Sequence, residues 1–269
     1  MYEGLALFYD SFTRDIDYGA IARFAGKHIL GCAAAKRALS RGERPIILDC
    51  GCGTGKLLDR LGDGFDRIGL DISYEMLNKA RQDSGDGILW LCQDMCRMDL
   101  YGSVSAILSM TDSVNHILTA KRLAAFFARA HNFLDPGGVL IFDIVTRNRF
   151  GDGKNEFVCF DDNEDESCFW TGKFYPRSGL LKYDVSHFRL VDAEKALYAR
   201  TDDTVTEKIW DGGLIIELLG KAGFAPVKTY RAGRGGAPEG STGKDRLYFV
   251  CVKGPRGRAP DADDHHTGG

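Results

Sequence analysis

Hydrophobic positions along the chain follow two periods, and the alternation between them predicts the fold class. Residues 1–42 are expected to be helical, because apolar side chains recur at helical spacing through residues 21–29. From Pro45 onward, short apolar runs alternate with segments of helical spacing. The runs predict strands at 46–48, 67–70, 88–91, 104–108 and 139–142, with helices at 57–61, 74–81 and 122–134. Short apolar strands separated by helices predict a parallel sheet that is covered on both faces.

The pattern changes between residues 151 and 205. Extended segments, several with alternating apolar and polar positions, occur at 157–160, 168–174, 180–191 and 196–201. They predict a mostly antiparallel insertion. The alternation of helix and strand then returns, with a helix at 214–221 and strands at 225–230 and 246–252. Residues 254–269 are rich in Gly, Pro, Asp and His and are expected to form a disordered tail.

A glycine-rich loop lies between the first predicted strand and the helix that follows it. Residues 49–55 read Asp-Cys-Gly-Cys-Gly-Thr-Gly. Glycines let a ligand approach the backbone closely, and a ligand in such a fold lies at the carboxyl ends of the strands. A phosphate-binding P-loop is excluded, because Cys50 stands at its first glycine and Leu57 at its hydroxyl position. A dinucleotide-binding loop would place its third glycine at position 56, where Lys56 stands, which weakens that alternative without excluding it.

The loop resembles motif I of class I S-adenosylmethionine-dependent methyltransferases, Asp-x-Gly-x-Gly-x-Gly. Later segments resemble the further motifs of this family in the same order: Asp71 after the second strand, residues 93–95 (QDM) after the third, residues 109–116 (SMTDSVNH) after the fourth and residues 134–140 (LDPGGVL) before the fifth. The resemblance implies an α/β fold with a Rossmann-like, seven-stranded, mostly parallel sheet. It also implies a methyltransferase (EC 2.1.1.-) whose cofactor is S-adenosyl-L-methionine.

Three further segments, residues 8–10 (FYD), 17–18 (DY) and 245–250 (DRLYFV), resemble a subset of bacterial small-molecule methyltransferases that includes sugar N-methyltransferases. That subset carries an antiparallel insertion after the fifth strand. The resemblance covers about residues 1–253. Together with the pattern above, it divides the chain into an N-terminal helical cap (1–42), a Rossmann-like cofactor-binding domain (43–150 and 206–253), an antiparallel β insertion that covers the acceptor site (151–205) and a disordered tail (254–269).

The resemblance also assigns cofactor contacts at the carboxyl ends of the strands. Asp49 would hold the methionine end of the cofactor, Asp71 would accept hydrogen bonds from both ribose hydroxyls, and Asp94 would contact the adenine amine. The other residues assigned to the cofactor are Gly51, Gly53, Gly55, Ile72, Met76, Met95 through its backbone N–H, and Ser109. Structural roles are the alternatives: a helix cap for Asp49, a salt bridge for Asp71, and core packing for Ile72 and Met76.

The acceptor is expected to be a small molecule that is methylated on nitrogen or oxygen. Methyl transfer from a sulfonium is an in-line displacement, so the protein mainly aligns the nucleophile and excludes water. An amine acceptor must present a free lone pair, and a nearby base or hydrogen-bond acceptor helps. Tyr9, Asp112 and His116 are therefore the candidate catalytic residues. His116 titrates near neutral pH, although a histidine on a helix surface explains the residue equally well.

Charge and composition narrow the range of partners. The formal net charge of −3 offers no basic face for nucleic acid, and residues 109–112 lack the Asn/Asp-Pro-Pro-Tyr/Phe motif of many nucleic-acid amino-methyltransferases. A small acceptor is thus favoured over DNA or RNA. The absence of a long apolar run and of a signal peptide predicts a cytoplasmic protein without a membrane span. The eight cysteines are expected to be reduced thiols, no metal is expected, and the protein is expected to be a monomer or a homodimer.

Two other functions remain open from the sequence. An NAD-dependent oxidoreductase would use a similar loop and the same acid, Asp71, but with a different glycine spacing. A non-catalytic module that binds S-adenosylmethionine is also compatible with the motifs, because this class has no universal catalytic side chain whose loss would be visible.

Overall fold

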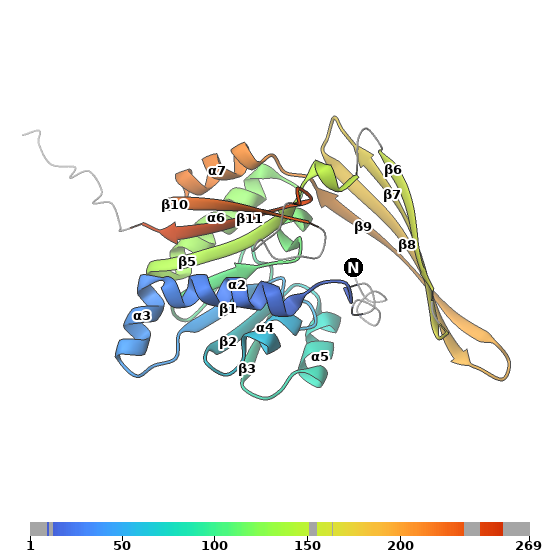
Figure 1. Ribbon diagram of the computed structural model, residues 1–269, viewed down its shortest axis with the longest axis horizontal. Coiled ribbons are helices and arrows are strands. Elements are labelled where there is room, and N and C mark those ends of the chain that lie inside the picture. Colours follow the sequence, from blue (N-terminus) through green and yellow to red (C-terminus); the bar gives the residue numbers. More distant parts are fainter. Residues whose placement is uncertain (1–9, 11–12, 151–154, 163, 234–242, 255–269) are drawn as a thin grey trace, which may run out of the picture.

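The computed structural model describes residues 10, 13–150, 155–162, 164–233 and 243–254, which form two separate sheets and their helices (Figure 1). The helices are α2 (Tyr18–Gly31), α3 (Ala33–Ser40), α4 (Lys56–Leu61), α5 (Tyr74–Asp83), α6 (Ala120–Phe133) and α7 (Gly212–Lys221), with short 3-10 helices η2 (Ser113–His116) and η3 (Arg147–Phe150). The main sheet contains β1 (Ile46–Cys50), β2 (Asp66–Asp71), β3 (Ile88–Cys92), β4 (Val104–Ser109), β5 (Leu134–Val145), β10 (Phe224–Ala232) and β11 (Arg246–Lys253). The insertion sheet contains β6 (Glu156–Asp162), β7 (Glu166–Tyr175), β8 (Leu180–Asp192) and β9 (Leu197–Lys208).

The main sheet has the strand order β10-β11-β5-β4-β1-β2-β3. The pairs β1–β2, β1–β4, β2–β3 and β4–β5 are parallel, whereas β10–β11 and β11–β5 are antiparallel. The predicted seven-stranded, mostly parallel sheet is therefore confirmed. Because β1 pairs with β2 on one side and with β4 on the other, the winding direction reverses at β1. Ligands of open α/β sheets bind at the carboxyl ends of the strands beside such a reversal.

Helices cover both faces of the main sheet (Figure 1). On one face, α2 and α3 bury small side chains such as Ala25 and Ala35, which lets these helices approach β4 and β5 closely. On the other face, Phe127 of α6 packs against Phe142 of β5, with ring centroids 5.4 Å apart. Phe142 in turn stacks on Phe249 of β11 at 4.7 Å. Burial of such large rings contributes about 1.5–3 kcal/mol each and holds the strand ends in fixed positions.

Strand β5 begins earlier than the hydrophobic pattern predicted. It starts at Leu134, which pairs with Val104, and the register then resumes at Val139, which pairs with Ala106. Residues 135–138, expected only to end helix α6, therefore form a bulge within the strand. The bulge needs glycine because Gly137 has a φ of +70° and because a Cβ on residue 138 would lie 2.9 Å from the Ser105 carbonyl oxygen.

The insertion sheet stands away from the main body and is joined to it near the ends of β5 and β9 (Figure 1). Its strands are antiparallel in the order β6-β7-β8-β9. One face carries a buried apolar cluster that includes Phe174, Leu181 and Val205. Strand β9 continues to Lys208, whose carbonyl oxygen accepts a 2.7 Å hydrogen bond from Asn115 Nδ2 in η2. The antiparallel character of the insertion is confirmed, while the boundaries of the four predicted units remain a prediction, and most of the predicted tail lies outside the described residues.

All eight cysteines lie within the described residues, and all are free thiols. None of the described helices is long and apolar enough to cross a membrane.

Candidate active site

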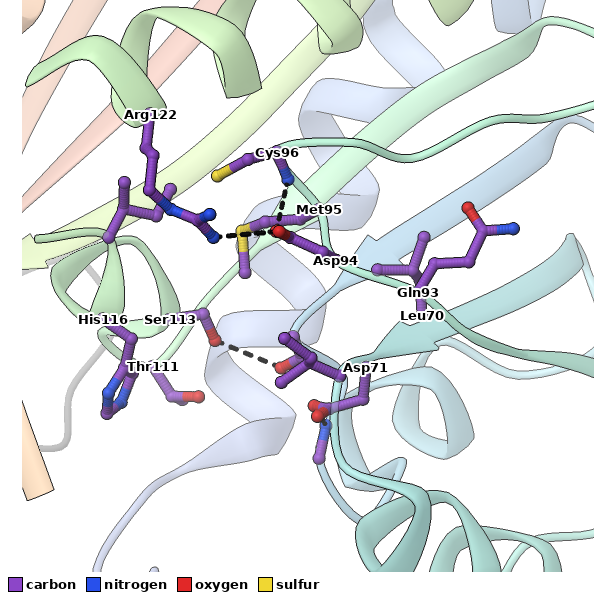
Figure 2. Close-up of a pocket in the computed structure, with 14 residues that line it drawn as sticks. Leu70, Asp71, Gln93, Asp94, Met95, Cys96, Thr111, Ser113, His116 and Arg122 are labelled. Carbon is purple, nitrogen blue, oxygen red and sulfur yellow. Dashed lines mark hydrogen bonds and ion pairs between the residues drawn. The ribbon is translucent and has the colours of Figure 1, made fainter. Parts of the chain in front are cut away.

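A pocket lies at the carboxyl ends of β1, β2, β3 and β4, beside the point where the winding reverses (Figure 2). Its lining residues are Gly51, Gly53, Leu70, Asp71, Ile72, Gln93, Asp94, Met95, Cys96, Thr111, Ser113, His116, Ile117 and Arg122. They come from four loops and the start of α6. A pocket built from the loops that follow parallel strands matches the position expected for a nucleotide-like ligand.

The glycine loop is required by the backbone as well as by any ligand. Gly51, Gly53 and Gly55 have φ values of +75°, +54° and +83°, in the left-handed region that side chains disfavour. A Cβ on Gly51 would lie 2.7 Å from the Ser113 hydroxyl oxygen, and a Cβ on Gly55 would lie 2.6 Å from the ring of Trp90. The requirement for glycine at Gly51 and Gly55 therefore has a cause besides ligand binding, which is close packing inside the protein.

Asp71 is held at the end of β2 with its carboxylate at the pocket wall (Figure 2). Its Oδ2 accepts a 2.9 Å hydrogen bond from the backbone N–H of Gly53, and its Oδ1 accepts one of 2.9 Å from Ser73. Burial raises the pKa of the Asp71 carboxyl, and these N–H donors oppose that rise. Ser73 also caps α5, since its hydroxyl accepts from the Met76 N–H at 3.2 Å. The glycine loop, the acid and the helix start are thus one hydrogen-bonded unit.

Asp94 lies on the opposite wall of the pocket and is paired with an arginine. Its carboxylate accepts hydrogen bonds of 3.1 and 2.9 Å from Arg122 Nη2 and one of 2.9 Å from the Cys96 N–H (Figure 2). Met95 lies beside it in the lining. Arg122 lies 28 residues further along the chain, at the start of α6. No local pattern marks it, so its pairing with Asp94 was not predictable from the sequence.

Three other predicted cofactor residues have different surroundings. Ile72 lines the pocket and is 63% exposed, so its side chain is accessible to a ligand in the pocket. Met76 is buried within α5 and is not part of the described lining. Ser109 is fully buried, and its hydroxyl donates a 2.9 Å hydrogen bond to the Cys50 carbonyl oxygen. The structure therefore places Ile72 at the pocket, and it places Met76 and Ser109 behind it.

Asp49 faces a smaller cavity that adjoins the pocket. Gly51 and Thr111 line both spaces, so the two spaces are neighbours. The carboxyl group of Asp49 is buried, and this burial, followed by the charge of Asp71, raises its pKa to about 7. Tyr18 of α2 lines the same cavity. Burial raises the pKa of Tyr18 to about 12, so its hydroxyl stays protonated as a hydrogen-bond donor.

Asp10, which precedes α2 in the chain, contacts two residues that line this cavity. Asp10 accepts a 2.7 Å hydrogen bond from the Thr54 hydroxyl and forms an ion pair with Lys56 at 3.1 Å. Thr54 belongs to the glycine loop, and Lys56 is the first residue of α4. The predicted catalytic residue Tyr9 immediately precedes Asp10 in the chain, and it lies outside the described residues.

Asp112 follows β4 in an unusual backbone conformation and is engaged by two arginines. Its φ is +63°, and that of Thr111 is +55°, conformations that cost about 1–3 kcal/mol and that occur mainly at functional sites. Asp112 Oδ2 is 3.0 Å from Arg246 Nη2 and 3.3 Å from Arg149 Nη1. Two guanidinium groups hold this carboxylate in place, so the geometry suits a role in orientation.

His116 ends η2 and lines the same pocket as Asp71 and Asp94 (Figure 2). Its side chain has an open surface toward solvent, yet protein atoms surround the ring closely enough to desolvate it. This desolvation lowers the pKa of His116, and the charges of Asp112 and Asp71 oppose the shift. The imidazole is therefore neutral near pH 7, a state in which one ring nitrogen can accept a proton.

Comparisons with known proteins indicate the activity of the chain. Residues 47–138 match a family model described as a methyltransferase domain. A presumed methyltransferase of Geobacillus sp. (strain WCH70) is 27% identical over 260 residues, which cover 94% of this chain and 99% of that protein. An S-adenosylmethionine-dependent methyltransferase from Clostridium acetobutylicum ATCC 824 has a TM-score of 0.73 at 23% identity, covering 94% of this chain and 99% of that one. The chain is an S-adenosylmethionine-dependent methyltransferase.

A further solved structure, the sugar N-methyltransferase KedS8 from Streptoalloteichus sp. ATCC 53650, has a TM-score of 0.70 at 21% identity, with 94% of both chains covered. The likeness to solved structures establishes the class I fold of this methyltransferase. The family model spans the glycine loop itself, so the loop belongs to a methyltransferase and not to a nicotinamide-dependent oxidoreductase.

The residues of this methyltransferase fit its cofactor chemically. S-adenosylmethionine carries a sulfonium and an ammonium cation, two ribose hydroxyls and an adenine amine, all of which seek anionic or hydrogen-bond-accepting partners. Asp49, Asp71 and Asp94 stand at or just after the carboxyl ends of β1, β2 and β3, and they line the pocket and its adjoining cavity. Three carboxylates in two neighbouring cavities therefore suit the ammonium, the ribose hydroxyls and the adenine amine of the cofactor.

Proposed function

We propose that this methyltransferase transfers the methyl group of S-adenosylmethionine to an amino group of a small acceptor. The observation that carries this proposal is the pocket that His116 and Thr111 line together with Asp71 and Asp94, beside the cavity that Asp49 and Thr111 line. A neutral imidazole in that pocket favours an acceptor that must lose a proton before it reacts. The structural likeness to a sugar N-methyltransferase supports nitrogen over oxygen.

The cofactor contacts in this proposal follow the order of the strands. Asp71 accepts hydrogen bonds from the ribose hydroxyls with the lone pairs that Gly53 and Ser73 leave free. Asp94 and the Met95 backbone contact adenine, and Ile72 covers the ring. Asp49 binds the methionine ammonium group and is ionised by it, because a nearby cation lowers the pKa of a buried carboxyl.

Catalysis in this proposal depends on alignment and on proton handling. When bound, the cofactor supplies a methyl group already activated by the sulfonium. The protein must place the acceptor nitrogen in line with the bond to be broken and must exclude water. His116 contacts the acceptor and helps to remove its proton, whereas Asp112, fixed by Arg246 and Arg149, orients the loop that carries Thr111. Tyr9 remains a predicted acceptor contact.

The test is a methyl-transfer assay that follows S-adenosylhomocysteine formation with a panel of amines. The panel contains glycine, glucosamine and a nucleoside-diphosphate-linked amino sugar, each beside its hydroxyl analogue. We expect turnover of at least one amine and a loss of about 100-fold or more in kcat for His116→Gln, the usual range for a lost acid–base group. His28→Gln on α2 is the matched control and should keep full activity. Turnover of hydroxyl compounds alone would contradict the nitrogen assignment.

A further inference from the structure

Five charged side chains meet where the two sheets join, and we call them the junction cluster: Asp112, Asp143, Arg149, Glu207 and Arg246. Arg246 of β11 forms ion pairs with Asp112 and with Asp143 of β5. Arg149 of η3 also pairs with Asp112. The Asp112 N–H donates to Asp143 Oδ2 at 3.4 Å. The cluster thus joins the loop after β4, the end of β5, the start of β11 and the base of the insertion sheet in one network.

Glu207 is the member of the junction cluster that comes from the insertion sheet. It lies on β9 and is only 6% exposed. Its Oε2 accepts a long, 3.4 Å hydrogen bond from the hydroxyl of Tyr183 on β8, which lies on the same face of the sheet. Arg149, Arg246 and Asp112 are the charged groups that face it from the main body.

The junction cluster holds more negative charge than positive charge. That excess exists only when its three carboxyl groups, Asp112, Asp143 and Glu207, are all ionised and face two guanidinium groups. Asp143 is fully buried, and its Oδ1 has no hydrogen-bond partner among the described residues. A buried acceptor without a donor costs about 1–3 kcal/mol, and an uncompensated buried charge costs more. The ionised cluster therefore lacks one positive, hydrogen-bond-donating group, which either a proton or a bound cation can supply.

The cluster is connected to the candidate active site through two of its members. Asp112 is the neighbour of Thr111, which lines both the cofactor pocket and the adjoining cavity. Lys208, the residue after Glu207, is bonded to Asn115 in η2, next to His116. Two members of the cluster are therefore adjacent in the chain to Thr111, which lines both cavities, and to Lys208, which is bonded to η2.

Glu207 has a high enough proton affinity to bind a proton in the free enzyme. Burial and the charge of Asp112 raise the pKa of Glu207 to about 8, although Arg149 and Arg246 oppose the rise. The free enzyme therefore carries a proton on Glu207 near neutral pH. Groups whose pKa values are close exchange protons readily, and primary amines of sugars and amino acids titrate within about one to two pH units of this value.

We propose that the junction cluster binds the ammonium group of the acceptor and that Glu207 takes up the proton that His116 helps to remove. This inference rests on the proposed amine methylation. Binding of the ammonium displaces to solvent the proton that Glu207 carries in the free enzyme, which leaves a carboxylate. In the step, an N–H bond of the ammonium then breaks and an O–H bond forms on the Glu207 carboxylate, which leaves a lone pair on nitrogen. That lone pair attacks the methyl carbon, and the electron pair of the breaking C–S bond stays on sulfur. The product leaves as a methylammonium ion, and Glu207 returns its proton to solvent.

The test compares Glu207→Gln with Glu156→Gln, a matched change at an exposed position on β6 of the same sheet. The first measurement is kcat/KM against pH for the best amine of the panel. Wild-type activity should rise toward pH 8, whereas Glu207→Gln should lose about 100-fold or more at pH 7 and follow the acceptor's own pKa in solution. Glu207→Asp should recover part of the loss, and Glu156→Gln should stay within about twofold of the wild type.

The second measurement does not depend on turnover. Calorimetry of the same amine with enzyme saturated by S-adenosylhomocysteine, in two buffers of different ionisation enthalpy, counts the protons released on binding. The wild type should release close to one proton at pH 7, and Glu207→Gln should release none. Equal S-adenosylhomocysteine affinity and equal melting temperature for wild type and variant would show that the fold and cofactor site are intact.

The outcomes separate this inference from the proposed function. Methylation of amines by both proteins with equal pH profiles and equal proton release would overturn the role of Glu207 and leave amine methylation standing. Methylation of hydroxyl compounds alone, or of no compound in the panel despite cofactor binding, would overturn the amine assignment and the inference with it.

Discussion

The cofactor edge of the main sheet and the junction cluster under the insertion sheet solve different problems with the same residue types. At the cofactor edge, Asp71 is held by backbone N–H groups of Gly53 and Ser73, which are 18 and 2 residues away. At the junction, Asp112 is held by the side chain of Arg246, which is 134 residues away. One carboxylate is positioned by its own motif, and the other is positioned by an ion pair between distant elements.

This difference has consequences for stability and for function. Backbone donors cannot be removed by substitution, so the cofactor edge is robust and its acids stay available to a ligand. Side-chain donors can be removed, and each loss leaves a buried charge behind. We therefore expect removal of a junction arginine to act first on folding, and substitutions at the cofactor edge to act first on binding.

The largest effect is expected for Arg246→Leu at the junction. This change leaves the fully buried Asp143 without its guanidinium partner and leaves Asp112 with Arg149 alone, which should lower the free energy of unfolding by about 3–5 kcal/mol. Urea denaturation followed by circular dichroism measures it. Arg200→Leu, which removes an exposed ion pair with Asp202 on the insertion sheet, is the control and should leave the midpoint unchanged. A loss below about 1 kcal/mol for Arg246→Leu would contradict this account of the junction.

At the cofactor edge, Asp71→Ala should weaken binding more than folding. Loss of charge-assisted hydrogen bonds to the ribose should raise the Kd for S-adenosylhomocysteine by about 100-fold, or about 3 kcal/mol. Calorimetric titration measures the change. Asp66→Ala at the start of the same strand, where the carboxylate pairs only with the exposed Arg44 among the described residues, should bind normally. Equal affinities for the two variants would remove Asp71 from the cofactor site.

A pair of glycines separates backbone strain from close packing at the cofactor edge. Gly51 and Gly42 have nearly equal φ values of +75° and +74°, but only Gly51 has neighbours at the position of a Cβ. Gly42→Ala should cost about 1–2 kcal/mol of stability from strain alone. Gly51→Ala should cost about 1–3 kcal/mol more, because its Cβ would overlap the Ser113 hydroxyl. Thermal unfolding of both variants measures the difference, and equal losses would assign the glycine requirement to the backbone alone.

The pH dependence of cofactor binding tests the cavity around Asp49. Its carboxyl has a pKa of about 7 in the free enzyme, against an ordinary value near 4 in the unfolded chain. The native state therefore holds a proton that the unfolded chain has lost between about pH 4 and 7, and stability falls as pH rises through that window. Binding of the cationic cofactor needs the ionised form, so its affinity should fall about tenfold per pH unit below pH 7. Calorimetry at pH 5.5, 6.5 and 7.5 would show this trend for the wild type, and Asp49→Asn should show a flat profile.

The smallest effect is expected for Arg122→Ala at the adenine end of the pocket. The Arg122 side chain is 45% exposed, so solvent already screens most of its attraction to Asp94. We expect the Kd for S-adenosylhomocysteine to change by less than about threefold, with unchanged stability. A change in Kd of tenfold or more would contradict this expectation and would show that Arg122 orients Asp94 toward adenine.

Much of the fold and of the cofactor edge was predictable because its causes are local. Period and turn residues predicted every strand of the main sheet, and the glycine loop, Asp71 and Asp94 were found from short motifs at strand ends. Ile72 was also placed at the pocket. Met76 and Ser109 were predicted at the pocket from their places in the motifs, and the structure buries both behind its wall, because the direction of a side chain depends on helix and strand packing that a motif does not contain.

What only the tertiary structure decided is the environment of charged groups that are distant in sequence. The sequence determined that Asp112, Asp143, Arg149, Glu207 and Arg246 exist and lie in predicted loops and strands. It could not show that they meet, because ion pairs across 37 to 134 residues leave no local pattern. The same holds for Arg122 beside Asp94 and for the burial that raises the pKa of Asp49 and Glu207. Proton affinity follows from burial and neighbouring charge, and both are properties of the folded chain.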